Sequence, residues 1–325
     1  MNRRTLLRIA ALGSLSTASI AGGKAQNPDT SAIQKALEDF DMLSPGRTAA
    51  CISIQGEHPD KALTLNAEQP LFVGSSVKTF ILAQYLKELE AGRLPENAQV
   101  QIGPEVWSPG SPVFIRLSGS TMAKSALEAM IAHSDNTATD IALKAAGADN
   151  VRKLIKDAGL SQTRIPDSTR ILFSYLAGAP DGTDLGWAGM EKMQSGTMPN
   201  QLRAAINDRQ TMMSTAAEMT QWYEQVLAGK HFQKPETLAE FKRISAMADA
   251  MPMLVPEDTV AYGKGGSIDW NGFHCFCVAG QMVLPSQRVS FCFIVNWEGD
   301  DATVPKVFAS FKEQSRQMLH LVAGK

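Results

Sequence analysis

The chain has 325 residues, of which 44% are hydrophobic and 20% are charged, and its formal net charge is −2. This composition excludes a disordered or low-complexity chain and is typical of a globular protein with a sizeable core, built as one domain or as two closely packed lobes. The first 26 residues carry four basic and no acidic side chains, so the remainder has 27 basic and 33 acidic residues, a net charge of −6. This acidic balance argues against a nucleic-acid partner.

The N-terminal stretch MNRRTLLRIAALGSLSTASIAGGKAQ begins with a twin arginine, Arg3 and Arg4, and continues into a weakly apolar segment with small residues near Ala21 and Ala25. These features favour a twin-arginine export signal over residues 1–25 rather than a short buried helix. The apolar segment is too short and too polar to span a membrane. We therefore expect the mature protein, residues 26–325, to have no membrane span and to be periplasmic or secreted.

The apolar periodicity after this segment predicts strands near both ends of the chain and helices between them. Strands are predicted at residues 48–56, 61–67, 259–266, 273–284 and 288–299. Helices are predicted at about residues 31–40, 75–91, 122–132, 136–146, 151–158, 216–227, 235–247 and 305–321. The pattern predicts an α+β fold in which residues 30–72 and 255–325 form the sheet part and residues 73–254 form an inserted all-helical lobe.

Ser75 and Lys78 lie three residues apart at the start of the predicted helix in FVGSSVKTFILAQYLKELEAGRL. A hydroxyl in the first turn feels the positive end of the helix dipole, and a side chain at i+3 returns to the same face. Serine is a poor nucleophile until a base takes its proton, and lysine can be that base when burial lowers its pKa. Because Ser and Lys are common at helix starts, this pair alone is weak evidence for a catalytic site.

Two further clusters follow Ser75 and Lys78. The stretch AHSDNTATD contains Ser134, Asp135 and Asn136, and AYGKGGSID contains Lys264 followed by Gly265, Gly266 and Ser267. Taken singly, the first can be a helix cap and the second a strand bulge. Together with S-x-x-K, and in this order, they resemble the signature set of class A β-lactamases and penicillin-binding proteins, most closely class A.

This resemblance implies a five-stranded antiparallel sheet covered by helices, with the active site in the cleft between the sheet and the helical lobe. It implies an acyl-enzyme on Ser75, with Lys78 as the base. Ser134 would relay a proton to the leaving group, and Lys264 would hold Ser134 and the electrostatic field.

The resemblance also implies residues that bind the substrate. Asn136 would bind the substrate amide, and Gly266 would let a substrate backbone approach the strand closely. The backbone N–H groups of Ser75 and Ser267 would form an oxyanion hole. Trp107 stands where the family has an aromatic residue on the wall of the cleft.

The chain departs from class A between residues 160 and 207, where the family's E-x-x-L-N loop, with its water-activating glutamate, is absent. A longer loop rich in Gly and aromatic residues is expected there instead. Asp167 is the nearest carboxylate in position and our first choice as deacylation base, and reuse of Lys78 is the alternative. The other carboxylates in this loop are Asp181, Asp184 and Glu191.

A second departure concerns the substrate carboxylate. Gly265 offers no hydroxyl where the family usually has Ser or Thr, and no arginine stands near Phe273 on the next strand. A carboxylate would then lose charge-assisted hydrogen bonds. We therefore expect weak binding of penicillins, unless a cation such as Arg170 or Arg288 takes over.

The four cysteines lie in apolar, strand-like runs, so we expect buried thiols rather than a structural disulfide. They are Cys51, Cys275, Cys277 and Cys292. No Cys/His spacing predicts a metal site, and no cofactor is expected.

Three functions remain open on this evidence. The first is an exported serine acyl-hydrolase that acts on a β-lactam, ester or amide and deacylates β-lactams slowly. The second is a penicillin-binding-like protein or sensor that stays acylated, and the third is a D,D-peptidase acting on cell-wall peptides. In each case we expect a monomer whose partner is a small-molecule acyl substrate.

Overall fold

The computed structural model describes residues 30–44, 47–56, 61–197 and 201–325. The predicted export signal, residues 1–25, lies outside these ranges. Within them, no helix is both long enough and apolar enough to cross a membrane.

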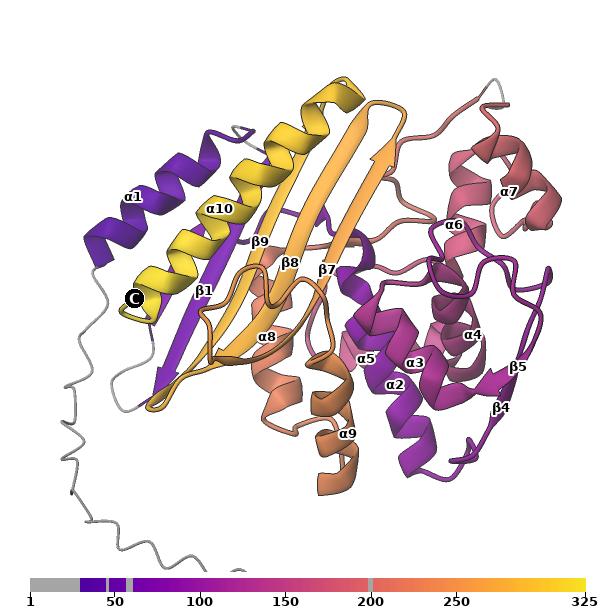
Figure 1. Ribbon diagram of the computed structural model, residues 1–325, viewed down its shortest axis with the longest axis horizontal. Coiled ribbons are helices and arrows are strands. Elements are labelled where there is room, and N and C mark those ends of the chain that lie inside the picture. Colours follow the sequence, from indigo (N-terminus) through magenta and orange to yellow (C-terminus); the bar gives the residue numbers. More distant parts are fainter. Residues whose placement is uncertain (1–29, 45–46, 57–60, 198–200) are drawn as a thin grey trace, which may run out of the picture.

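The centre of the fold is a five-stranded antiparallel sheet with the order β2-β1-β9-β8-β7 (Figure 1). Its strands are β1 (Thr48–Gly56), β2 (Lys61–Leu65), β7 (Val260–Trp270), β8 (Phe273–Val283) and β9 (Gln287–Glu298). They come from both ends of the chain, and β9, the last strand in the sequence, lies between β1 and β8. The predicted α+β fold with a five-stranded antiparallel sheet is confirmed.

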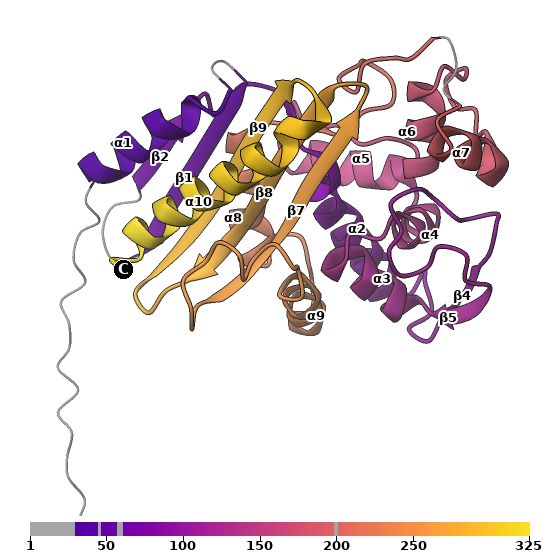
Figure 2. The same ribbon diagram turned by 45° about the horizontal axis from the view of Figure 1, so that its top comes forward.

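The two terminal helices, α1 (Thr30–Asp41) and α10 (Val304–Val322), lie side by side on one face of the sheet (Figure 2). Aromatic rings fill the space beneath them. The Phe40 ring of α1 lies 5.9 Å from that of Phe293 on β9 and 5.8 Å from that of Phe311 on α10. Because each buried ring removes a large apolar area from water, a few residues hold both helices to the sheet.

The opposite face is covered by α8 (Ala216–Leu227), which contacts β1, β8 and β9. The helical lobe lies next to it and contains α2 (Lys78–Glu90), α3 (Ala123–Ala132), α4 (Asn136–Ala146), α5 (Ala148–Asp157) and α9 (Pro235–Ser245). Trp222 of α8 joins α8 to the lobe, because its ring lies 4.6 Å from that of Phe80 and its indole N–H donates to Thr79 at 3.0 Å. Helix α8 falls within the range predicted for the lobe, yet it packs on the sheet.

The sequence pattern does not predict several short elements. Helices α6 (Thr169–Leu176) and α7 (Gly186–Gln194) form where a long loop is expected. Each is too short to show a clear helical period, although Ser168 caps α6 by accepting a hydrogen bond from the Ile171 N–H at 2.9 Å. The remaining short elements are β3 (Leu71–Phe72), β4 (Gln99–Ile102), β5 (Gly119–Met122), β6 (Met213–Ser214) and the 3₁₀ helix η2 (Asp301–Thr303).

One buried amide ties β3 to the sheet. The side chain of Asn296 on β9 accepts a hydrogen bond from the Phe72 N–H at 2.9 Å and donates one to the Phe72 carbonyl at 2.9 Å. Asn296 is 1% exposed, so water does not take over these bonds. Since β3 leads directly into the turn that carries Ser75, Asn296 fixes the point from which this turn leaves the sheet.

We predict that Asn296→Ala lowers the free energy of unfolding by about 2–4 kcal/mol, because it leaves two buried backbone groups with lost partners. Denaturant or thermal unfolding followed by circular dichroism measures the change. Gln317→Ala, which removes an exposed amide from α10, is the control and should change stability little. Equal stability of the two variants would contradict the anchoring role of Asn296.

Candidate active site

Ser75 lies in η1 (Gly74–Val77), a 3₁₀ turn, and Lys78 is the first residue of α2. We expected Ser75 in the first turn of an α-helix. This is wrong, because Ser75 lies in a 3₁₀ turn that directly precedes the α-helix. In a 3₁₀ helix the side chains at i and i+3 eclipse each other, so this tighter turn still places Ser75 and Lys78 on one side. Among the described residues, the Ser75 hydroxyl has no hydrogen-bond partner and is free to react.

Two glycines let β7 approach the Ser75 turn at backbone distance. A Cβ on Gly266 would lie 2.1 Å from the Val73 carbonyl oxygen and 2.8 Å from the Ser75 nitrogen. A Cβ on Gly74, whose φ is +53°, would lie 2.8 Å from the Ser267 nitrogen. Neither position accepts a side chain without displacing backbone. The contact brings the backbone nitrogens of Ser75 and Ser267 into one neighbourhood, as an oxyanion hole requires.

The side chain of Lys78 is fully buried, and its Nζ has three polar neighbours. Nζ lies 2.6 Å from the Ser134 carbonyl oxygen, 2.7 Å from Asn136 Oδ1 and 3.2 Å from Ser134 Oγ. The first two oxygens only accept, so they take two of the N–H groups. The hydroxyl can accept a third N–H from an ammonium, or it can donate its own proton to a neutral amine. Lys78 and Ser134 can therefore exchange a proton while both side chains stay in place.

Burial lowers the pKa of Lys78 well below its usual value, and the positive charge of Lys264 lowers this pKa further. Asp135 and Asp140 act in the opposite direction but do not outweigh burial. A lysine that is neutral at physiological pH can take the proton of a neighbouring serine. The buried amine and the Ser134 hydroxyl therefore form a pair that can transfer a proton.

Ser134 is held in a left-handed backbone conformation, with φ of +56°, which is uncommon for a residue other than glycine. The buried carboxylate of Asp135 supports this turn by accepting three backbone N–H bonds, from Ala138 at 2.8 Å, Val113 at 2.8 Å and Phe114 at 2.9 Å. The bond from Ala138 caps α4. Within the Ser134-Asp135-Asn136 motif, Asp135 is thus the helix cap, and Ser134 is the residue that contacts Lys78.

Lys264 of β7 is 1% exposed and lines one cavity together with Ser134, Gly265, Gly266 and Ser267. Its Nζ donates to the Gly265 carbonyl at 2.7 Å, and no hydrogen bond joins it to Ser134 in the part of the chain described. Burial lowers the pKa of Lys264 to about 8, although Asp249 opposes this shift. At neutral pH Lys264 is therefore mostly charged, and this charge contributes to the lowered pKa of Lys78.

The predicted cleft wall is attached to the site through Asn136. Its Nδ2 donates to the Pro109 carbonyl at 2.6 Å, which holds the segment that carries Trp107. The Trp107 ring lies edge-on, 5.7 Å from the ring of Trp187 in α7. The Asn136 amide is already hydrogen-bonded through its Oδ1 to Lys78 and through its Nδ2 to the Pro109 carbonyl. A substrate amide that binds Asn136 has to compete with these two bonds.

A family model described as the β-lactamase enzyme family matches residues 32–279, which is more than half of the chain and includes the Ser75, Ser134 and Lys264 motifs. The chain belongs to the β-lactamase enzyme family. The family and the fold together make it a β-lactamase-like serine hydrolase.

Solved structures share this fold at low sequence identity. A β-lactamase from Chitinophaga pinensis is 17% identical with a TM-score of 0.68, over 90% of this chain and 98% of that chain. PBP-A is 17% identical with a TM-score of 0.66, over 92% and 98% of the two chains. The chromosome-encoded β-lactamase of Vibrio parahaemolyticus is 17% identical with a TM-score of 0.66, over 89% and 98%. No curated protein matches the chain.

The carboxylates of the 160–207 stretch of this β-lactamase-family chain are engaged elsewhere. Burial raises the pKa of Asp167, but hydrogen bonds from Arg152 and Gln210 outweigh burial and lower this pKa overall. Asp167 lines a different cavity from Lys264, and within the described residues it has no contact with Ser75 or Lys78. The other three have their own partners: Gln210 for Asp181, Arg170 for Asp184, and Arg116, at 3.9 Å, for Glu191.

The arginines considered as substitute anchors for a substrate carboxylate do not line the cavity of Lys264. Arg170 donates to Asp184 at 2.8 Å and to the carbonyls of Pro104 and Trp107 at 3.1 and 3.2 Å. Arg288 lies on β9, where it pairs with Val283 in the sheet register. Neither arginine is available for a ligand at the Ser75 turn.

The four cysteines are buried free thiols. The described residues contain no group of three or more His, Cys, Asp or Glu side chains that could hold a metal ion.

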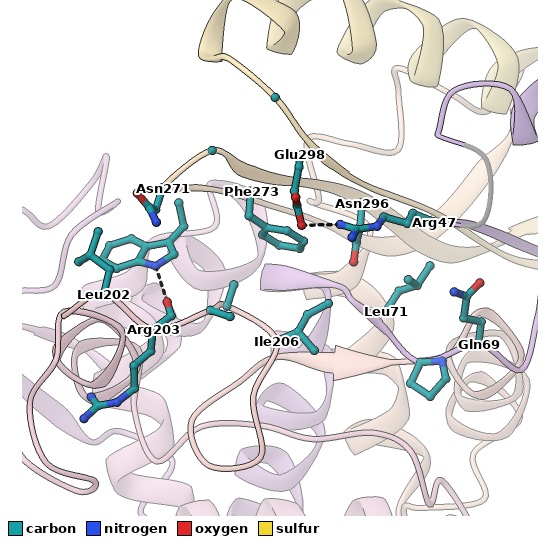
Figure 3. A pocket seen from close by; sticks show the side chains of 16 residues that line it. Arg47, Gln69, Leu71, Leu202, Arg203, Ile206, Asn271, Phe273, Asn296 and Glu298 are labelled. Atoms are coloured by element: carbon teal, nitrogen blue, oxygen red, sulfur yellow. Dashed lines mark hydrogen bonds and ion pairs between the residues drawn. The ribbon is translucent and has the colours of Figure 1, made fainter.

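A larger cavity, about 800 Å³, lies elsewhere, between the end of β7, β3 and residues 202–206 (Figure 3). Several of its polar side chains are already paired. Arg47 forms an ion pair with Glu298 at 2.9 Å, and Asn296 holds β3. The Arg203 guanidinium points away from the cavity and donates to the Ala179 carbonyl at 2.6 Å. The cavity contains neither the nucleophile nor either buried lysine, so its size does not mark the active site.

The pKa of Lys264 sets a pH dependence. If its positive charge supports acylation, the second-order acylation rate falls as pH rises through about 8, because deprotonation removes that charge. Lys264→Arg should shift this loss to higher pH, since a guanidinium stays protonated. Hydrolysis of a p-nitrophenyl ester between pH 6 and 10, corrected for the buffer reaction, gives both profiles. An alkaline limb that is unchanged in Lys264→Arg would show that another group titrates.

Proposed function

We propose that the protein is an exported serine acyl-hydrolase that forms an acyl-enzyme on Ser75. The observation that carries this proposal is the fully buried, pKa-lowered Lys78, which directly follows the Ser75 turn and whose Nζ lies 3.2 Å from Ser134 Oγ. Lys78 takes the Ser75 proton as Ser75 Oγ attacks the carbonyl carbon of a β-lactam, ester or amide. The carbonyl oxygen gains negative charge in this step, and the backbone N–H groups of Ser75 and Ser267 bind it.

Collapse of the tetrahedral intermediate breaks the bond to the leaving group, which needs a proton. Ser134 Oγ lies 3.2 Å from Lys78 Nζ, so Ser134 donates its own proton to the leaving group and recovers one from Lys78. This returns Lys78 to the neutral form and leaves the acyl group on Ser75. The proton taken from Ser75 thus ends on the leaving group.

Deacylation requires a base for the attacking water. Asp167 remains the nearest carboxylate to the family's position, but its ion pair with Arg152 and its lowered pKa disfavour it as a proton acceptor. We propose that Lys78, neutral again after acylation, serves as this base. The Lys78 Nζ stays hydrogen-bonded to the Ser134 carbonyl oxygen and to Asn136 Oδ1. The attacking water therefore has to approach Nζ from the Ser75 side. This restricted approach makes the deacylation of β-lactams slow.

We also propose that the protein is exported, on the basis of the twin arginine at its N-terminus, and that it acts as a monomer on small acyl substrates. A penicillin-binding-like sensor and a D,D-peptidase share the acylation half of this mechanism. They differ from the proposed hydrolase in the fate of the acyl group and in the natural substrate.

The nucleophile assignment predicts that Ser75→Ala abolishes covalent labelling by a fluorescent penicillin or a fluorophosphonate. Ser76→Ala is the matched control, because the Ser76 hydroxyl is directed to the Lys264 carbonyl at 3.2 Å rather than to substrate. Gel fluorescence and mass spectrometry of the labelled peptide measure the result. Labelling of Ser75→Ala at another residue would refute the assignment.

Slow deacylation predicts a rapid burst followed by a slower steady state when the enzyme meets a saturating chromogenic cephalosporin. Stopped-flow absorbance gives the burst, and intact-mass analysis of quenched enzyme shows the adduct. Asp167→Asn should leave the steady-state rate nearly unchanged if Lys78 is the base. A loss of about 100-fold or more in Asp167→Asn, with normal acylation, would assign the base to Asp167 instead.

A further inference from the structure

His274 of β8 is a fully buried histidine outside the active site. In the sheet register it stands between Asp269 of β7 and Trp297 of β9. Its imidazole ring stacks on the Trp297 ring, with a centroid distance of 4.8 Å and an interplanar angle of 25°. Because the ring is packed among three strands, its plane is fixed and each ring nitrogen has a defined partner.

Both ring nitrogens of His274 face oxygens that only accept hydrogen bonds, one from a carboxylate and one from a backbone carbonyl. Nδ1 lies 2.8 Å from Asp269 Oδ1, and Nε2 lies 3.0 Å from the Gly299 carbonyl oxygen. A neutral imidazole carries one N–H and one lone pair, so it satisfies only one of these contacts, whereas an imidazolium donates to both. The geometry therefore fits the protonated ring.

The charged groups that act on His274 favour the same state. They are Asp269 of β7 and Asp301 of η2, whose Oδ1 lies 3.9 Å from Nε2. On β9 the carboxylate of Glu298 is engaged by Arg47. Burial alone would lower the pKa of His274, but its two hydrogen bonds and the two negative charges outweigh burial and raise this pKa.

Gly299 connects His274 to the wall of the large cavity. The Gly299 N–H donates to the Gly272 carbonyl at 2.9 Å, so this backbone bond joins the β7–β8 turn to the β9–α10 connection. Both glycines line the cavity of about 800 Å³, next to Asn271 (Figure 3). The His274 ring holds the same two segments together from inside the sheet, and it therefore supports one wall of this cavity.

We propose that His274 is a pH-sensitive latch that joins Asp269 at the end of β7 to Gly299 in the β9–α10 connection as an imidazolium, and joins only one of them as a neutral imidazole. The neutral ring keeps its N–H toward the Asp269 carboxylate, because a charged acceptor makes the stronger hydrogen bond. Its lone pair then faces the Gly299 carbonyl. Loss of the proton therefore releases Gly299 and loosens the cavity wall, whatever reaction takes place at Ser75.

The direction of the pH effect follows from the raised pKa of His274. A group that binds its proton more tightly in the folded state stabilises the fold fully below its unfolded pKa, which is about 6.5 for histidine. This contribution is lost as pH rises through the folded pKa. The latch is therefore closed in mildly acidic solution and opens as the solution becomes alkaline.

Asp269→Asn tests the latch, because the Asp269 side chain is 58% exposed and its change should leave the fold intact. NMR of the histidine Cε1–H groups between about pH 5 and pH 9 gives the pKa of His274, whose signal is assigned through its contact with the Trp297 ring. We expect this pKa to lie above the ordinary histidine value in wild-type protein and to fall in Asp269→Asn. Asp258→Asn removes another exposed carboxylate, just before β7, and as the matched control should leave the pKa of His274 unchanged.

Hydrogen exchange of the Gly299 amide, corrected for the intrinsic effect of pH, measures the opening itself. In wild-type protein the protection of this amide should fall with the same midpoint as the His274 titration, and in Asp269→Asn the midpoint should move to lower pH. Constant protection of Gly299 across the His274 titration would rule out the latch. A pKa of His274 that is no higher in wild-type protein than in Asp269→Asn would rule it out as well.

Discussion

The active site depends on one contact between two segments of backbone. Gly266 of β7 and Gly74 of the Ser75 turn meet at distances that no side chain permits. This contact sets the position of the nucleophile against the sheet, and the sheet in turn contributes Lys264 and the Ser267 N–H from the same strand. Asn296 holds the other end of the turn through Phe72. The Ser75 turn is therefore held on one side by a backbone contact and on the other by a buried side-chain amide, and acyl transfer requires such fixed positions.

The two buried lysines act as an electrostatic pair with different roles. Burial lowers the pKa of both, and the positive charge of Lys264 lowers that of Lys78 further, so the two pKa values are separated. Two like groups whose environments separate their pKa values are a common way to obtain acid and base behaviour from one residue type. The sequence motifs identify both lysines as candidate site residues. The burial and the mutual charge effect that shift their pKa values are visible only in the three-dimensional structure.

The sequence predicts much of this fold because its signals are local. The apolar runs of β8 and β9, the capping residues before α4 and the order of the three motifs are all visible in short windows. The short helices α6 and α7 are missed because eight or nine residues, which in α7 include two glycines, give little periodicity. The engagement of Asp167 by Arg152 is also missed, because no local pattern shows which side chain pairs with this carboxylate.

The position of β9 has a consequence for how the protein is made. Strand β1 is complete at residue 56 and β2 follows it at once, yet β9, its hydrogen-bonded neighbour on the other side, does not begin until residue 287. At the usual rate of translation this interval lasts on the order of tens of seconds. During that time the helical lobe can emerge from the ribosome while β1 exposes an unpaired edge, which is a site for aggregation. The sheet that carries Lys264 and the Ser267 N–H is incomplete until its last strand is synthesised, so one edge of β1 stays unpaired for most of the chain's synthesis.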